Sequence, residues 1–177
     1  MTELPGKPSL AQMSQKTKQL HEAIDAHMRQ SGQPYLHPDG GPTVQLDLPA
    51  DLPTALCDAT MVEQVLLNLA RNGMQAMDHA DCRARVLTLR VGKAASNAQQ
   101  GWLEFSVTDM GSGIDPEVAE QLFTPFFTTK AEGMGLGLSL CRTVVEQHGG
   151  QLSHRANLPN GTVFSFTLPY RNGTNDT

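Results

Sequence analysis

The sequence lacks three features that would indicate other classes of protein: an excess of positive charge, a long apolar run and closely paired cysteines. Its 13 Lys and Arg residues are outnumbered by 18 Asp and Glu residues, for a formal net charge of -5. A general nucleic-acid binder instead needs an excess of cations to neutralise phosphates. No apolar run approaches the roughly 18 residues of a membrane-spanning helix, and no basic segment followed by an apolar core marks a secretory signal. We therefore expect a cytoplasmic segment without a nucleic-acid partner or membrane contact.

Cysteine is scarce as well. Cys57, Cys82 and Cys141 are odd in number and widely spaced, so neither a disulfide framework nor a zinc site is predicted. Hydrophobic residues make up 39% and charged residues 18% of the 177-residue chain, proportions typical of a single globular domain. We expect residues 9–170 to form that domain, with residues 1–8 and 171–177 disordered.

Apolar periodicity and turn residues divide the chain into helices and strands. The most regular helical pattern spans residues 58–77, where Asp58 is a candidate N-cap. Further helices are predicted over residues 9–30, 115–122 and 136–148, and strands over residues 44–48, 85–91, 102–108, 151–156 and 162–168.

Two amide side chains, Asn68 and Asn72, lie four residues apart on the predicted central helix and so project from one face. An amide oxygen is a hard, neutral ligand that suits Mg²⁺, which takes most of its negative ligands from substrate phosphates. The pair is therefore a candidate metal and phosphate site. Taken alone, two asparagines on a helix surface are the simpler interpretation.

Asp109 ends a predicted strand and is followed by Gly111 and Gly113. An ionised carboxylate only accepts hydrogen bonds, so at the floor of a pocket it could accept one from the exocyclic amine of adenine and discriminate against guanine. The glycines would let the main chain turn sharply and approach the base. The alternative is an ordinary β-turn, in which Asp and Gly are common.

A second glycine cluster, Gly133, Gly135 and Gly137, precedes an amphipathic helix. Main-chain N–H groups at the start of such a helix bind phosphate oxygens, and glycine would allow the preceding loop to open and close as a lid. Neither G-x-G-x-x-G nor G-x-x-x-x-G-K-[ST], the spacings of the common phosphate-binding loops, occurs here. A flexible surface loop that leads into a helix is the alternative.

Between the two glycine clusters lies the Phe-rich segment L-F-T-P-F-F-T-T-K, residues 122–130. Pro125 and the polar residues 128–130 argue against a long buried element, and an aromatic hinge for a mobile lid fits better. Lys130 would be a mobile cation that reaches the terminal phosphates of a nucleotide. A solvated surface lysine is the alternative.

The order of these motifs resembles the ATP-binding catalytic domain of two-component sensor histidine kinases, in the superfamily that includes gyrase B, the mismatch-repair ATPases and the large heat-shock chaperone. Residues 44–170 carry the resemblance. The segment N-L-A-R-N (68–72) is similar to the N box, D-M-G-S-G-I (109–114) to the first glycine box, L-F-T-P-F-F-T-T-K (122–130) to the F box, and G-M-G-L-G-L (133–138) to the second glycine box. The F-F-T-T-K form and the short lid resemble the nitrogen-regulation and oxygen-sensing subclass. The resemblance implies a two-layer α/β sandwich, in which a mixed sheet of about five strands packs on three helices.

The resemblance also implies ATP and Mg²⁺ as cofactors. Asn72 would bind the metal, Asn68 and Lys130 would be the catalytic residues beside the phosphates, and Asp109 would bind adenine. The residues implied to contact the nucleotide are Asn68, Asn72, Asp109, Gly111, Gly113, Phe126, Thr129, Lys130, Gly133, Gly135, Leu136 and Gly137.

By the same resemblance, the chain would transfer the γ-phosphoryl group of ATP to a histidine on a separate dimerisation domain, and a cognate response regulator would be a further partner. The related ATPases have a water-activating Glu one turn before the metal-binding Asn. Here that position is Asn68, whose amide cannot take a proton, and Glu63 lies more than two turns from Asn72. Transfer to a protein is therefore favoured over hydrolysis. An ATPase clamp of the same superfamily and a non-catalytic nucleotide-binding module are the alternatives.

His21 lies on the first predicted helix but lacks the proline expected near a phosphoacceptor, so the accepting histidine is expected outside this chain. Met110 stands where the family usually has a polar residue, Gly73 replaces a usual Ala, and a basic residue common near Gln75 is missing. The Gly73 change costs a helix roughly 1 kcal/mol. None of these departures removes a residue implied to bind ATP or Mg²⁺. We therefore expect them to affect the affinity for nucleotide, not whether it binds. His148 is expected at a helix end, where the helix dipole favours it.

Overall fold

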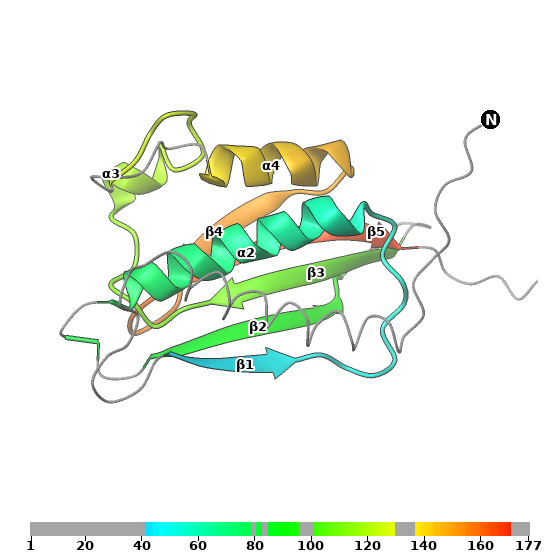
Figure 1. Cartoon of the computed structure of the whole chain (residues 1–177), viewed down its shortest axis with the longest axis horizontal. Coiled ribbons are helices and arrows are strands. Elements are labelled where there is room, and N and C mark those ends of the chain that lie inside the picture. The colour runs from blue at the N-terminus through cyan, green and yellow to red at the C-terminus, as the bar shows by residue number, and fades with distance from the viewer. Residues whose placement is uncertain (1–41, 79–80, 83–84, 96–100, 130–136, 171–177) are drawn as a thin grey trace, which may run out of the picture.

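The computed structural model describes residues 42–78, 81–82, 85–95, 101–129 and 137–170. In chain order the elements are β1 (Thr43–Asp47), α2 (Ala59–Ala76), β2 (Val86–Lys93), β3 (Gly101–Thr108), α3 (Pro116–Ala119), α4 (Gly137–Gln147), β4 (Leu152–Ala156) and β5 (Thr162–Tyr170). Figure 1 shows the strands as one layer, with α2 and α4 lying side by side over it. The predicted helix 9–30, with His21, lies outside the described residues.

The strands form one mixed sheet with the order β1-β2-β3-β5-β4. β1 and β2 are parallel, and α2 makes the connection between them. The other three pairings are antiparallel, and β5 separates β3 from β4. The predicted two-layer α/β sandwich with a five-stranded mixed sheet is confirmed.

Helix α2 is the central element of the helical layer. It begins after Asp58, whose side chain accepts a hydrogen bond of 3.0 Å from the main-chain nitrogen of Met61 and so caps the helix. Its buried residues recur every three or four positions, which places them on one face; they are Val62, Val65, Leu69, Ala70, Gly73 and Met74. The observed helix lies within one residue of the predicted range at each end.

The core lies between α2 and the central strands. In β3, alternate residues Leu103, Phe105 and Val107 are buried, as expected for a strand with one face toward a helical layer. The rings of Phe105 and Phe166 stack across β3 and β5 with centroids 4.9 Å apart. Because both central strands are packed in this way, the C-terminal end of β3 has a fixed position beneath α2.

Two elements differ from the sequence prediction. The helix expected over residues 115–122 spans only Pro116–Ala119. Beyond it, the N–H groups of Gln121 and Leu122 bond to carbonyls three residues earlier, which is the tighter pattern of a helix that is ending. The first strand stops at Asp47, one residue before Leu48.

Candidate functional site

Asp109 follows β3 directly and is only 3% exposed. Its Oδ1 atom accepts hydrogen bonds from the main-chain nitrogens of Gly111, at 2.8 Å, and Thr162, at 3.3 Å. Burial raises the pKa of the carboxyl group, and the two N–H groups partly oppose that rise. The result is a buried acceptor group held in one orientation by main-chain dipoles.

The turn after Asp109 needs glycine at two positions for different reasons. A Cβ atom on Gly111 would lie 2.5 Å from the carbonyl oxygen of Ala76, so the turn packs directly against the end of α2. Gly113 has a φ of +79°, a conformation that residues with a side chain rarely adopt. The predicted D-x-G-x-G turn therefore follows β3 and packs against the end of α2.

Helix α2 crosses Asp109 at Gly73. A Cβ atom on Gly73 would lie 3.2 Å from Cβ of Asp109 and 2.7 Å from Cδ1 of Leu87. The departure from the usual Ala thus has a packing reason, because the glycine lets the helix approach the carboxylate closely. Asn72, the preceding residue, is half-buried. The structure therefore places the helical turn of α2 that contains Asn72 next to Asp109.

Asn68 lies one helical turn before Asn72 and faces the start of α4. Its Oδ1 atom lies 3.7 Å from the position that a Cβ on Gly137 would take. The Asn68 side chain also hydrogen-bonds the thiol of Cys141, whose pKa is raised to about 11, mainly by burial. The five residues from Asn68 to Gly73 rise about 7.5 Å along the helix. Asn68 beside Gly137 and Gly73 beside Asp109 therefore mark two neighbouring points along α2.

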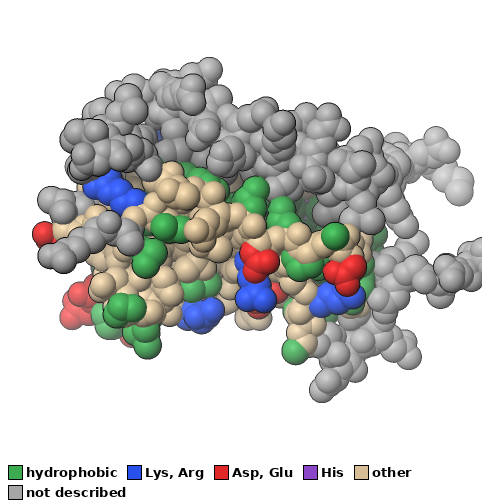
Figure 2. Space-filling view, turned by 90° about the horizontal axis from the view of Figure 1, so that it is seen from below, with side chains coloured by type: hydrophobic (Ala, Val, Ile, Leu, Met, Phe, Trp, Pro, Cys, Tyr) green, Lys and Arg blue, Asp and Glu red, His purple; other side chains and the backbone are tan. Residues whose placement is uncertain are grey.

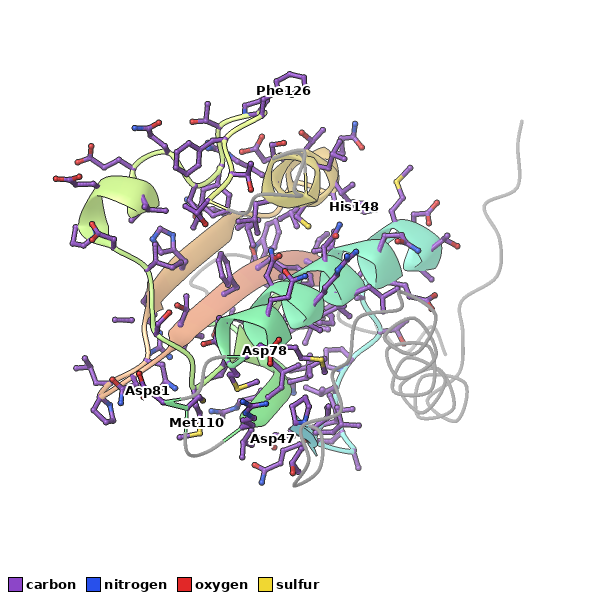
Figure 3. All side chains as sticks on the ribbon, turned by 60° about the vertical axis from the view of Figure 1, so that its left-hand side comes forward. Asp47, Asp78, Asp81, Met110, Phe126 and His148 are labelled. Atoms are coloured by element: carbon purple, nitrogen blue, oxygen red, sulfur yellow. The ribbon has the colours of Figure 1, made fainter. Side chains whose placement is uncertain are left out.

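The Phe-rich segment is divided between a half-buried and an exposed part. The ring of Phe123 lies 5.8 Å from the ring of His154, and the guanidinium of Arg142 lies 5.8 Å above it. Phe126 has a φ of +65° and is 74% exposed, and Figure 3 shows it far from Met110, the neighbour of Asp109. Thr129 is also exposed. The structure therefore does not bring Phe126 to the carboxylate. Lys130, Gly133, Gly135 and Leu136 lie outside the described residues.

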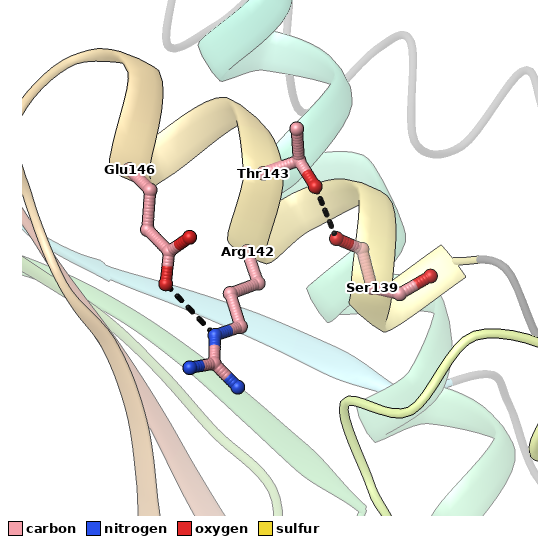
Figure 4. Close-up of polar contacts among 4 residues, drawn as sticks. All are labelled: Ser139, Arg142, Thr143 and Glu146. Atoms are coloured by element: carbon pink, nitrogen blue, oxygen red, sulfur yellow. Dashed lines mark hydrogen bonds and ion pairs between the residues drawn. The ribbon is translucent and has the colours of Figure 1, made fainter.

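The outer side of α4 carries polar pairs one turn apart. Nε of Arg142 lies 2.8 Å from Oε1 of Glu146, and the Thr143 hydroxyl donates to the Ser139 carbonyl at 3.0 Å (Figure 4). Seen from below, the described surface has acidic and basic side chains next to one another (Figure 2). None of the described helices combines the length and hydrophobicity needed to cross a membrane.

Two residues of the site were missed by the sequence reasoning. Thr162 is 4% exposed, and besides its N–H contact to the carboxylate, its carbonyl accepts from the Asp109 nitrogen at 3.0 Å. The side-chain amide of Asn157 donates to the main-chain carbonyl of Asp109 at 2.9 Å. The sequence indicated only the two strands over residues 151–156 and 162–168, and nothing in that pattern shows which strand end lies beside their connection.

The family model described as "Histidine kinase-, DNA gyrase B-, and HSP90-like ATPase" matches residues 57–172. The chain is 44% identical over 118 residues to the C4-dicarboxylate transport sensor protein DctS of Rhodobacter capsulatus, and 42% identical over 124 residues to the sensor protein FixL of Bradyrhizobium diazoefficiens. These matches cover 67% and 70% of this chain but only 17% and 23% of the relatives, so the chain spans about a fifth of their length.

Among solved structures, the catalytic domain of histidine kinase ThkA matches with a TM-score of 0.64 and 25% identity, over 89% of this chain and 94% of that chain. Full-length ShkA in complex with AMPPNP matches with a TM-score of 0.68 and 23% identity, over 97% of this chain and 32% of that chain. Because its sequence identity is below 25%, the similarity to ShkA concerns the fold alone. The resemblance predicted from the four motifs is confirmed.

Proposed function

The chain belongs to the family of histidine kinase-, DNA gyrase B- and HSP90-like ATPases, and on this basis we propose that it binds Mg-ATP and passes the γ-phosphoryl group to a histidine of a separate dimerisation domain. It is an ATP-binding catalytic domain of the sensor histidine kinase type. A cognate response regulator would then receive the phosphoryl group. The cytoplasmic part of a sensor protein is the location that suits this role.

The observation that carries the proposal is the buried carboxylate of Asp109 beneath α2. Both N–H groups that hold it contact Oδ1, so we assign Oδ2 as the acceptor for the exocyclic amine of adenine. A buried acceptor of this kind discriminates strongly, because a base with a carbonyl in place of the amine would leave it without a donor. Gly113 would line the base pocket, and Gly111 packs the turn against the end of α2.

The phosphate end is assigned to the turn of α2 at Asn68, next to the turn that meets Asp109. Asn68 faces the first turn of α4 at Gly137, and the N-terminus of a helix favours phosphate. The amide oxygen of Asn72 suits Mg²⁺, which would neutralise charge on the phosphate oxygens. Lys130, Gly133, Gly135 and Leu136, together with Thr129, keep the roles that the motifs predict. Phe126 is 74% exposed and lies far from Met110, so it is not assigned to the adenine end.

Transfer to a protein histidine is favoured over hydrolysis by the chemistry at Asn68. Its amide has no basic lone pair at neutral pH, and it bonds to the Cys141 thiol. Glu63 is exposed and lies more than two helical turns before Asn72. An accepting imidazole brings its own nucleophilic nitrogen, so the domain has only to align the reactants and neutralise charge.

The proposal is tested with the isolated chain and a histidine-containing dimerisation domain from one of the similar sensor kinases. Calorimetric titration with Mg²⁺ and a non-hydrolysable ATP analogue should show binding that Asp109→Asn weakens by at least tenfold. With radiolabelled ATP, label should appear on the supplied domain and be lost with Asn72→Ala. Steady phosphate release without label on that domain would instead indicate a hydrolase. Binding without either product would indicate a nucleotide-binding module.

A further inference from the structure

We propose that Asn157, in the turn between β4 and β5, is a positioning residue that holds Asp109 in the orientation required for adenine. The inference rests on the proposed adenine role of Asp109 and adds a residue that lies outside all four sequence motifs. Asn157 is 48 residues from Asp109 in the sequence, and its side chain reaches the Asp109 main chain directly.

The turn and the end of β3 are joined by a set of hydrogen bonds. The Asn157 amide donates to the Asp109 carbonyl at 2.9 Å, and the Asn157 main-chain nitrogen donates to the Gly161 carbonyl at 3.0 Å. The Asp109 nitrogen donates to the Thr162 carbonyl at 3.0 Å. One asparagine therefore both closes its own turn and binds the strand end next to it.

The approach of the two segments is close enough to require glycine. A Cβ atom on Gly161, whose φ is +116°, would lie 2.0 Å from the Asp109 carbonyl oxygen. With the main chains this near, the half-buried Asn157 amide lies within reach of a carbonyl at the point where β3 has left the sheet. The Asn157 side chain thus continues the hydrogen bonding between the two segments beyond the end of the β3–β5 pairing.

The hydrogen bond acts on the carboxylate through the main chain. The carbonyl that Asn157 binds belongs to the peptide between Asp109 and Met110, and the next peptide carries the Gly111 N–H that holds Oδ1. Rotation of the first peptide would carry the second with it and loosen the carboxylate. Asn157 therefore limits the motion of an acceptor that it does not touch.

The test compares ADP with inosine diphosphate, which has a carbonyl in place of the exocyclic amine. Wild-type protein should bind ADP more tightly, because only ADP donates to Asp109. In Asn157→Ala, we expect the dissociation constant for ADP to rise roughly five- to tenfold, with that for inosine diphosphate almost unchanged. Asn157→Asp, which keeps the shape but turns an acceptor toward the carbonyl, should lose at least as much.

Asn160→Ala is the matched control, because this exposed asparagine lies in the same turn. It should bind both nucleotides as wild type does. If Asn157→Ala lowers affinity for both nucleotides equally, or for neither, the positioning role is wrong. Asn157→Ser, which keeps a turn-forming residue too short to reach the carbonyl, gives the same comparison if the alanine variant does not fold. Wild-type protein that binds both nucleotides equally would overturn the adenine role of Asp109 itself.

Discussion

The imidazole of His148 accepts a hydrogen bond of 3.0 Å at Nε2 from the main-chain nitrogen of Asp58. Its Nδ1 lies 2.7 Å from the carbonyl oxygen of Val144. Since the Asp58 nitrogen can only donate, Nε2 is the ring nitrogen that accepts, and Nδ1 is the one that faces the Val144 carbonyl as a donor. The position at the end of α4 agrees with the sequence, and the ring also connects the end of α4 to the start of α2.

Replacing His148 should therefore loosen the two helices that carry the site. We expect His148→Ala to lower the free energy of unfolding by roughly 1–2 kcal/mol, because the Asp58 N–H loses its acceptor. Urea unfolding followed by circular dichroism measures the change. His148→Gln, whose amide oxygen can accept the same hydrogen bond, should recover part of the loss. An alanine variant as stable as wild type would show that the bridge contributes nothing.

The Asp109 carboxylate should lower the free energy of unfolding at neutral pH, although its proposed role is to bind adenine. Burial raises its folded-state pKa above the unfolded value of 3.8, so its favourable contribution is full below about pH 4 and is lost as the pH rises through the folded pKa. Asp109→Asn has no such titration. We expect the stability of wild type relative to Asp109→Asn to fall between about pH 4 and neutrality in urea unfolding without nucleotide. A difference independent of pH would contradict the raised pKa.

A second titration is expected at Cys141, which is 1% exposed and has a pKa raised from 9.0 to about 11. The folded state holds the thiol proton more tightly, so stability is retained below pH 9 and lost as the pH rises toward 11. Over this range, wild type should lose up to roughly 2 kcal/mol more than Cys141→Ala. The half-buried Cys57 and Cys82 are present in both proteins, so the comparison isolates Cys141. Parallel curves for the two proteins would contradict the prediction.

Local patterns in the sequence were enough to predict most of the fold. The periodicity of residues 58–77 and the cap at Asp58 predicted α2 to within a residue at each end, and strand alternation placed Asp109 at a strand end. The sequence could not predict contacts that depend on register between distant segments. Asn157 and His148 bind main-chain atoms 48 and 90 residues away, and their partners follow from how β3, β5 and the two helices pack.

Gly73 gives the most direct test of how α2 and Asp109 fit together. In an exposed helix, alanine would be more stable than glycine by roughly 1 kcal/mol. Here the added Cβ would meet Cδ1 of Leu87 at 2.7 Å and Cβ of Asp109 at 3.2 Å. Leu87 is fully buried, so it has little room to move, and overpacking costs roughly 1–3 kcal/mol. We therefore expect Gly73→Ala to be destabilising and to weaken ADP binding, measured by urea unfolding and calorimetry.

The double variant Gly73→Ala with Leu87→Val separates the two contacts. Valine lacks the Leu87 atom that the new methyl group would meet, so stability should return toward wild type once the helix gains alanine. The contact with Asp109 Cβ remains in the double variant, and ADP binding should therefore stay weak. If both properties recover together, the steric conflict lies with Leu87 alone and α2 does not press on the carboxylate. If Gly73→Ala alone stabilises the protein, helix propensity outweighs packing at this crossing.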